Sequence, residues 1–201
     1  MPQPYEPQQM PQPYEPQQDH YVACLDLGGR NCLVVGGGKV GHEKVAGLLA
    51  CGARVTVVAP EVSDEVAALP VELVCREYRT SDLDGRRLVI AATSDEQVNR
   101  RVFDDAEARN LFCNVADVPE LCSFILPAVH RQGPIVVAVS TGGASPALAQ
   151  MLRDRFASQV GEEHESLAVE LRSLRPWVKE NFDTYEERRD FFRERVTQVL
   201  G

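Results

Sequence analysis

The first half of the chain alternates between short apolar runs and stretches with helical spacing. Five apolar runs are typical of strands buried on both faces of a sheet, and they lie at residues 31–36, 54–60, 71–78, 86–93 and 111–117. Residues 21–27 predict a further short strand. Helical stretches lie between strands at residues 42–52, 63–69 and 95–110. This alternation predicts an α/β fold with a Rossmann-like parallel sheet that helices cover on both faces.

The pattern changes after Asp117. Residues 122–141 contain two β-like runs separated by the sequence RQGP, which predicts an antiparallel hairpin. A helix then starts with Ser145 as its N-cap and Pro146 in its first position.

The chain from Glu162 onward is charged and helical throughout. We expect two helical segments there, broken near Pro176 and again at residues 181–183. The patterns divide the chain into four regions: a Pro- and Gln-rich tail over 1–20, a Rossmann domain over 21–117, a β-hairpin segment or linker over 118–145 and a helical domain over 146–201.

The tail is a direct repeat, because residues 1–9 read MPQPYEPQQ and residues 10–18 read the same. A segment so rich in proline and glutamine cannot build a core, so we expect it to be disordered. A Pro-rich ligand for a partner domain is the functional alternative.

Composition and charge exclude several classes of function. The 201 residues carry a net charge of −9, so no broad surface neutralises the phosphates of nucleic acid, although one pocket can still be positive. The six cysteines form no CxxC pair, which predicts reduced, mostly buried thiols. The N-terminus lacks the features of a signal peptide, and no apolar run approaches the roughly 20 residues of a membrane span. We expect a cytoplasmic protein with no membrane partner.

A glycine turn between the first buried strand and the first helix is the main candidate for cofactor binding. Gly36, Gly38 and Gly41 have the spacing GxGxxG, which permits a tight turn, close approach of a pyrophosphate and close packing of helix on strand. The helix N-terminus offers free N–H groups to phosphates. The predicted cofactor-binding residues here are Gly36, Gly38, Lys39, Val40 and Gly41. A glycine-rich connection that binds nothing is the alternative.

The end of the second strand departs from the usual dinucleotide pattern. An Asp or Glu commonly binds the ribose hydroxyls there, but this chain has Ala59 and Pro60, with Glu61 next. Glu61, or backbone groups near Pro60, would take over ribose recognition. No arginine follows this strand directly, which favours NAD over NADP.

Other candidate site residues follow the fourth and fifth strands, where open α/β sheets bind their ligands. Thr93 is expected to contact the cofactor, although Ser94 or Asp95 beside it also suits a helix N-cap. Asp117 is a candidate general base, and an Asx-turn residue is the equal alternative. Asn114 is a candidate hydrogen-bond donor in the same crevice.

A second glycine turn, STGGASP at residues 140–146, precedes another helix and could bind an anion. Its candidate residues are Thr141, Gly142, Gly143 and Ser145. The alternative is a capped turn without a ligand. The four histidines are scattered and show no metal-ligand spacing, so we predict no stable metal site.

Four of these motifs, in this order, resemble precorrin-2 dehydrogenases, the dehydrogenase/ferrochelatase family of siroheme synthesis. They are CLVVGGGKVGHEKVAGLLACGARVTVVAPE, LVIAATSDEQVNRRV, FCNVADVPELCSFILPAV and IVVAVSTGGASPALAQMLRDRF. The resemblance covers about residues 21–158, and more loosely the helical tail. VVAP at the second strand looks like the usual form of the family, as does Asp117 within NVAD. Thr141 stands where the family often has serine.

The resemblance implies NAD-dependent oxidation of precorrin-2 to sirohydrochlorin, with Asp117 in catalysis or chelation. Some members of the family also insert Fe²⁺, which the sequence leaves undecided here. The loop at 140–146 would bind carboxylates of the tetrapyrrole. A homodimer joined through the hairpin is also implied, and it would cover strand edges at residues 123–129 and 135–139. Two alternatives are an NAD(H)-sensing module without catalysis and a dehydrogenase for another substrate.

Overall fold

The structure is a computed structural model, and it describes residues 20–201. The repeat at residues 1–18, with the predictions made for it, therefore lies outside the described residues. The chain divides into two compact units at Phe124 and Ile125.

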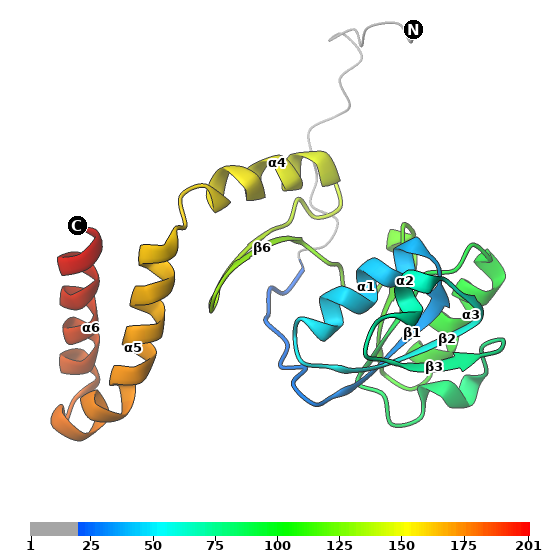
Figure 1. The fold of residues 1–201 in the computed structure, drawn as a ribbon, viewed down its shortest axis with the longest axis horizontal. Helices are drawn as coiled ribbons and strands as arrows, with labels where there is room; N and C mark the ends of the chain where they lie inside the picture. Colours follow the sequence, from blue (N-terminus) through cyan, green and yellow to red (C-terminus); the bar gives the residue numbers. More distant parts are fainter. Residues whose placement is uncertain (1–19) are drawn as a thin grey trace, which may run out of the picture. The chain divides into compact units, whose positions relative to one another are not determined.

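The first unit is an α/β layer structure around a parallel sheet (Figure 1). Its strands have the order β3-β2-β1-β4-β5, and every adjacent pair runs parallel. The strands are β1 (Asn31–Gly37), β2 (Arg54–Val62), β3 (Glu72–Cys75), β4 (Leu88–Ala91) and β5 (Phe112–Val115). The helices are α1 (Lys39–Leu49), α2 (Asp64–Ala67) and α3 (Glu96–Glu107), with short 3₁₀ turns at Thr80–Leu83 and Pro119–Leu121. The predicted doubly covered parallel sheet is confirmed.

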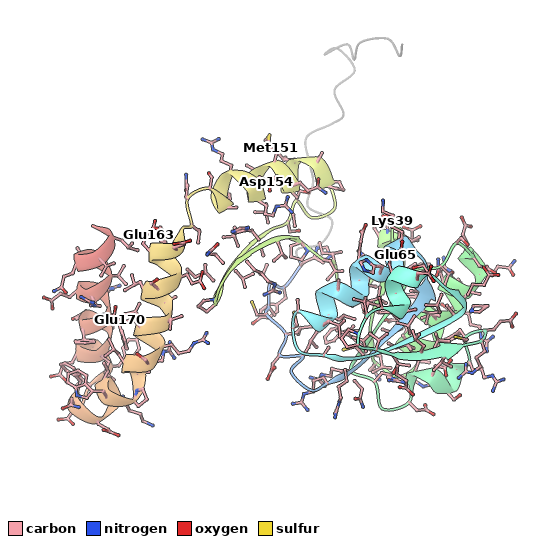
Figure 2. The ribbon with its side chains drawn as sticks, viewed as in Figure 1. Lys39, Glu65, Met151, Asp154, Glu163 and Glu170 are labelled. Atoms are coloured by element: carbon pink, nitrogen blue, oxygen red, sulfur yellow. The ribbon has the colours of Figure 1, made fainter. Side chains whose placement is uncertain are left out.

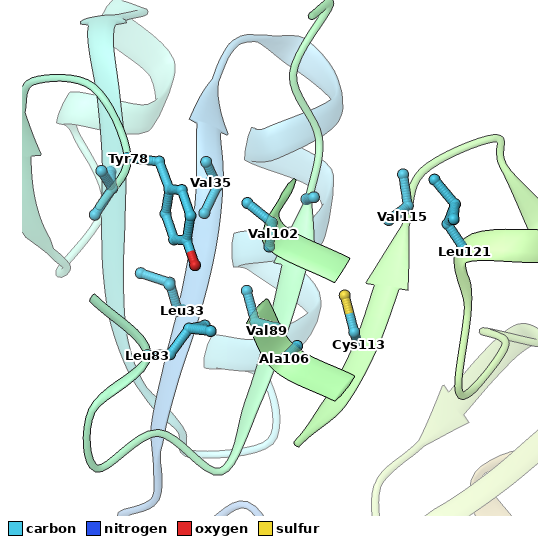
Figure 3. Close-up of a cluster of buried hydrophobic side chains, with 12 residues drawn as sticks. Leu33, Val35, Tyr78, Leu83, Val89, Val102, Ala106, Cys113, Val115 and Leu121 are labelled. Atoms are coloured by element: carbon cyan, nitrogen blue, oxygen red, sulfur yellow. The ribbon is translucent and has the colours of Figure 1, made fainter. Parts of the chain in front are cut away.

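Two apolar clusters lie on opposite faces of this sheet. Successive side chains of a strand point to opposite faces, so Leu33 and Val35 belong to one cluster and Cys32 and Val34 to the other. Helices α1 and α2 cover the Val34 face, while α3 covers the Leu33 face. Figure 3 shows the cluster on the Leu33 face, with the ring of Tyr78 beside the strand side chains. Such double coverage explains why these strands are almost continuously apolar.

The strand predicted at residues 21–27 is wrong. The segment pairs with no strand in the described part of the chain, and only Leu27 is buried. Leu27 packs into the cluster under α1, while the Asp26 side chain accepts a hydrogen bond from the N–H of Gly28 and forms a turn. The apolar run therefore contributes one core residue and then turns into β1.

The second unit contains a two-stranded antiparallel hairpin and three helices. The hairpin joins β6 (Ala128–Gln132) to β7 (Ile135–Val139) through Gly133 and Pro134. Gly133 has φ of 52°, as the first position of a two-residue type II′ turn requires. Helix α4 (Pro146–Ala157) packs on both strands, and α5 (Glu162–Asn181) and α6 (Tyr185–Leu200) pack on each other.

Pro176 does not break its helix, contrary to our prediction. Helix α5 runs from Glu162 through Pro176 to Asn181. The residues after the proline are held against α6, because Trp177 stacks tilted on Phe191 and Val178 is fully buried. These contacts offset the loss of one backbone N–H donor. The predicted break at residues 181–183 is confirmed, and Thr184 caps α6 there.

Helix α1 approaches β1 so closely that one glycine has no room for a side chain. A Cβ added to Gly41 would lie 2.3 Å from the carbonyl oxygen of Gly36. Gly47 is on the same helix, but a Cβ there would meet nothing within 4 Å. The same substitution therefore has opposite consequences at these two positions.

We predict that Gly41→Ala lowers the free energy of unfolding by about 1–3 kcal/mol, because helix and strand must separate. Gly47→Ala is the matched control, and it should raise the stability by about 0.5–1 kcal/mol by removing the backbone entropy of an exposed helical glycine. Urea unfolding followed by circular dichroism measures both. Equal effects of the two substitutions would contradict the close approach.

Candidate functional site

A cleft of about 1040 Å³ opens along the carboxyl edge of the sheet in the first unit. The segments that line it follow β1, β2, β3, β4 and β5. The strand order reverses between β1 and β4, and this is the place where open α/β sheets bind their ligands. The predicted residues that line the cleft are Gly36, Gly38, Lys39, Val40, Pro60, Glu61, Thr93 and Asp117.

The glycine turn forms the floor of the cleft. Gly36 has φ of 122°, and a Cβ there would lie 2.3 Å from the carbonyl oxygen of Ala92. Only glycine fits this position. Gly38 is the opposite case, because a Cβ would meet nothing within 4 Å. The backbone at Gly38 therefore borders open space in the cleft.

The N-terminus of α1 is free to bind an anion. Its N-cap, Gly38, provides no side-chain hydrogen bond, and its first turn has no acidic residue. By contrast, Asp95, Ser145 and Thr184 cap α3, α4 and α6 with their own side chains. Figure 2 shows Lys39 at this end of α1. The free N–H groups and the lysine give the first turn of α1 a positive character that suits an anion.

The end of β2 shows why the usual acid is absent. Ala59 is only 5% exposed, and its side chain lies close to Gly37. The pairing of β1 with β2 shifts between Val35 and Gly37, so β2 runs on through Pro60 to Val62. Glu61 is consequently exposed and lines the cleft. Gly37, which sequence reasoning missed, is required because a Cβ there would lie 2.5 Å from the carbonyl oxygen of Glu61.

The loop after β4 is fixed by a buried amide that we did not predict. The Asn99 side chain accepts hydrogen bonds from the N–H and hydroxyl of Thr93, the latter at 2.8 Å, and donates one to the Thr93 carbonyl. Asn99 is 6% exposed. Thr93 lines the cleft, but its hydroxyl is already engaged within the protein. Asp95 caps α3, as the alternative interpretation of this stretch proposed.

Asp117 also lines the cleft, two residues after the end of β5. Its φ of 62° places it in the left-handed region, where Asp and Asn are the best tolerated residues other than glycine. Its side chain is exposed, lines the cleft and makes no hydrogen bond or ion pair to any described residue. The carboxylate is therefore available to a ligand.

The cleft residues that were not anticipated from the sequence also include Glu77, Tyr78 and Arg101. The Tyr78 hydroxyl bonds to Asp105 at 2.9 Å, and the pKa of Tyr78 is raised, mainly by burial and next by that bond. The Arg101 guanidinium lies 5.6 Å from the centre of the Tyr78 ring. Arg101 comes from a helix whose charged face gives no signal of a site, which explains why sequence reasoning missed it.

The segment that carries Glu77 and Tyr78 is braced by an ion pair. Arg76 binds Asp82 through two nitrogens at 2.8 and 2.6 Å, and the N–H of Arg79 donates to the same carboxylate. The hydrogen bond from Arg76 is the main reason why the pKa of Asp82 is lowered. Because Asp82 is nearly buried, this pair fixes the cleft wall after β3.

Comparison with known proteins agrees with this geometry. A family described as putative NAD(P)-binding matches residues 23–128, which include the whole cleft. The chain belongs to this NAD(P)-binding family. A second family, described as sirohaem biosynthesis protein central, matches residues 132–159.

Relatives of this NAD(P)-binding chain carry names from the same pathway. Siroheme synthases of Methylobacillus flagellatus and Thioalkalivibrio sulfidiphilus are 42% and 44% identical to it over 88% and 87% of the chain. The chain spans only 39% and 36% of those proteins. A solved structure described as SirC, precorrin-2 dehydrogenase, is 27% identical, with a TM-score of 0.73 and coverage of 90% of both chains.

Two further predictions concern residues outside the cleft. Asn114, on β5, is 7% exposed, and its amide donates to the carbonyl of Phe124 at 3.0 Å and to the sulfur of Cys122. This side chain ties β5 to the segment that follows it. Gly41 underlies the glycine turn through packing and does not line the cleft.

The loop at 140–145 belongs to the second unit and is largely satisfied by its own atoms. Gly142 donates to the Ser140 hydroxyl, Ser145 to the Thr141 hydroxyl, and Leu148 to the Ser145 hydroxyl. The capped turn that we weighed as an alternative is thus present. Gly142 and Gly143 have positive φ, which the turn requires.

Over residues 20–201, no group of three or more His, Cys, Asp or Glu side chains is placed to hold a metal ion. No helix in this range is long and apolar enough to cross a membrane. The six cysteines are free, as predicted, but only Cys32 and Cys113 are buried, and Cys24 and Cys75 are exposed.

We predict that Asp82→Asn destabilises the chain by roughly 2 kcal/mol at pH 7, because a charge-assisted pair is lost. The folded-state pKa of Asp82 is lowered, so the pair contributes its full stability above the unfolded pKa of about 3.9 and loses it as the pH falls through the folded pKa. Urea unfolding between pH 3 and pH 7 measures the free energy of unfolding of the variant and of the parent. The difference between the two should become smaller toward low pH. A difference independent of pH would contradict the assignment.

Proposed function

We propose that this chain oxidises precorrin-2 to sirohydrochlorin with NAD⁺. The observation that carries the proposal is that one cleft contains both a free dinucleotide cradle, at Gly36 to Val40, and an unpaired carboxylate, Asp117. The likeness to a precorrin-2 dehydrogenase over 90% of both chains supports the substrate class. A sensor of NAD(H) would need the cradle but has no use for Asp117.

The residues have separate tasks in this reaction. The first turn of α1 and Lys39 would hold the pyrophosphate, and Glu61 would accept hydrogen bonds from ribose hydroxyls. When bound, the nicotinamide ring supplies the hydride acceptor, so that NADH forms. Loss of a proton from the macrocycle balances the loss of hydride, and the Asp117 carboxylate accepts that proton as a general base.

The cleft favours NAD over NADP. Glu61 and Glu77 both line the part of the cleft that follows β2 and β3, where a 2′-phosphate would meet their negative charge. Arg101 also lines the cleft, but it is shared with Asp105 at 3.9 Å and Thr80 at 3.3 Å. The ribose side is therefore better suited to free hydroxyls.

Substrate contacts of Asn114, Thr141, Gly142, Gly143 and Ser145 stay predictions. The support differs among them. Asn114, Thr141 and Ser145 already bond to neighbouring groups, whereas the N–H of Gly143 makes no hydrogen bond within the described chain. Gly143 is thus the residue of that loop best able to bind a carboxylate.

Insertion of Fe²⁺ into sirohydrochlorin is a second candidate activity. It is favoured by the name siroheme synthase carried by relatives at 42–44% identity, since siroheme contains iron. Fe²⁺ would be a substrate, and Asp117 would accept protons that the macrocycle releases. Incubation of the purified chain with sirohydrochlorin and Fe²⁺ tests this. A rate of siroheme formation equal to the rate without protein would contradict this activity.

We also infer a homodimer through the hairpin. Its exposed face consists of Val129, Val136 and Ala138 together with Arg131, and its two strands have unpaired edges within the described unit. Light scattering of the purified chain would report the mass. A monomer at micromolar concentration would contradict the inference.

We predict that Asp117→Asn lowers kcat for NADH formation from precorrin-2 by roughly 10²–10⁴-fold, because the general base is lost. Asparagine tolerates the positive φ, so the backbone is preserved. Kd for NAD⁺ should stay within about twofold. Glu120→Gln, an exposed acid nearby that lies outside the cleft, is the matched control. An unchanged kcat for Asp117→Asn would remove Asp117 from the reaction.

We predict that Glu61→Gln weakens NAD⁺ binding by about tenfold. A tenfold change corresponds to about 1.4 kcal/mol, close to the lower end of what a hydrogen bond to a charged group contributes. Binding of NADP⁺ should weaken less or improve, because one negative charge is removed. Isothermal titration with both cofactors measures the ratio of the Kd for NADP⁺ to the Kd for NAD⁺. Glu43→Gln, on the exposed side of α1, is the control. A ratio that does not change would show that Glu61 does not select the cofactor.

A further inference from the structure

A second cavity, of about 670 Å³, lies on the helical hairpin of α5 and α6. Four of the side chains that line it are arginines, namely Arg175, Arg188, Arg189 and Arg193, and two are aromatic, namely Tyr185 and Phe192. No Asp or Glu of residues 20–201 lines it. The dinucleotide cleft and its proposed chemistry do not use this cavity.

The charge of the cavity is opposite to that of the chain. The protein has 30 acidic against 21 basic residues, yet four cations surround one cavity without an acid among them. Like charges at short range repel each other, and this cost is offset when an anion binds between them. A solvated helix face in so acidic a chain would be expected to mix both signs.

Two of the arginines are held in place by the protein. Arg188 donates to the carbonyls of Phe182 and Asp183, and Arg189 pairs with Asp190 at 2.8 Å. The pKa of Asp190 is lowered by its hydrogen bond to Arg189 first and further by the charge of Arg193. Asp190 therefore orients Arg189 from outside the cavity.

The other two arginines are available. Arg175, on α5, makes no hydrogen bond or ion pair with the described residues, and Arg193 interacts only at longer range, with Asp190. Both are exposed. A guanidinium binds a carboxylate through two parallel N–H donors, so two free guanidiniums can each take one carboxylate.

We propose that this cavity binds a polycarboxylate with a flat aromatic body, of the tetrapyrrole class. The arginines bind the carboxylates, and the rings of Tyr185 and Phe192 provide apolar faces on which a macrocycle packs. The volume is within the usual range of about 300–1,000 Å³ for small-molecule sites. The choice of a tetrapyrrole rests on the proposed function, whereas the requirement for an aromatic polyanion rests on the cavity itself.

The single tryptophan gives a direct readout of binding. Trp177 is on α5, two residues after Arg175, and it is half-exposed. Uroporphyrin is a tetrapyrrole polycarboxylate whose absorption overlaps the emission of tryptophan, so it serves as the probe. Titration of the full chain with uroporphyrin should quench Trp177 in a saturable manner, and added salt should weaken the binding.

The decisive comparison is between the double variant Arg175→Gln/Arg193→Gln and a control variant, Arg172→Gln. Arg172 is also an exposed arginine of α5, but it does not line the cavity. The double variant should bind uroporphyrin at least tenfold more weakly, and the Arg172 variant should match the parent. Equal affinity of the double variant and the parent would overturn the proposal.

A lysine variant and a competition experiment complete the test. Arg175→Lys/Arg193→Lys retains the charges but not the paired donors, so its affinity should fall between the other two. If it binds as weakly as the glutamine variant and both melt earlier than the parent, folding is the cause and the proposal fails. Inorganic triphosphate that competes as strongly as uroporphyrin would show an anion site without aromatic selectivity, which also overturns it.

Failure of this inference can be distinguished from failure of the proposed function. NADH formation from precorrin-2 tests the dehydrogenase on its own. If NADH forms and the double variant binds uroporphyrin normally, only the arginine cavity is wrong. If no NADH forms but the double variant loses uroporphyrin binding, the cavity stands and the reaction is wrong.

Discussion

The close contact between α1 and β1 is the constraint on which the rest of the first unit depends. No side-chain carbon fits between Gly41 and the carbonyl of Gly36, or between Gly36 and the carbonyl of Ala92. Helix and strands therefore meet backbone to backbone at the point where the strand order reverses. This contact places the first turn of α1, with its free N–H groups and Lys39, at the cleft, where we propose that a dinucleotide phosphate binds.

The walls of the cleft are held by polar contacts that face away from the ligand. Arg76 and Asp82 fix the segment after β3, Asn99 fixes Thr93 after β4, and Asn114 ties β5 to the carbonyl of Phe124. Each of these groups is satisfied within the protein. The residues left without partners, above all Asp117, are those that a ligand can use. Such a division keeps the reactive groups in position before a ligand binds.

In the second unit, too, some side chains hold the helices together and others are left to line a cavity. Trp177, Phe182 and Phe191 pack together between α5 and α6. Arg195 joins the two helices through Glu170, which Figure 2 labels on α5. Four arginines of α5 and α6 line one cavity, and the acid that pairs with Arg189 is not among its lining residues. The net charge of the chain therefore says little about the local chemistry of this unit, because the sign of a site depends on which side chains the fold brings together.

The sequence by itself determined the layer structure and the dinucleotide turn. Both are local properties: apolar runs at the right spacing form buried strands, and GxGxxG after a strand has one favoured geometry. The same local reasoning failed for residues 21–27, which lack a pairing partner, and for Pro176, which tertiary packing carries within a helix. Only the tertiary structure decided that Glu61 and Asp117 share a cleft with Glu77 and Arg101, and that Asn114 is a brace. Those relations join residues far apart in the chain, and the strand register and helix packing that bring them together leave no mark in any short stretch of sequence.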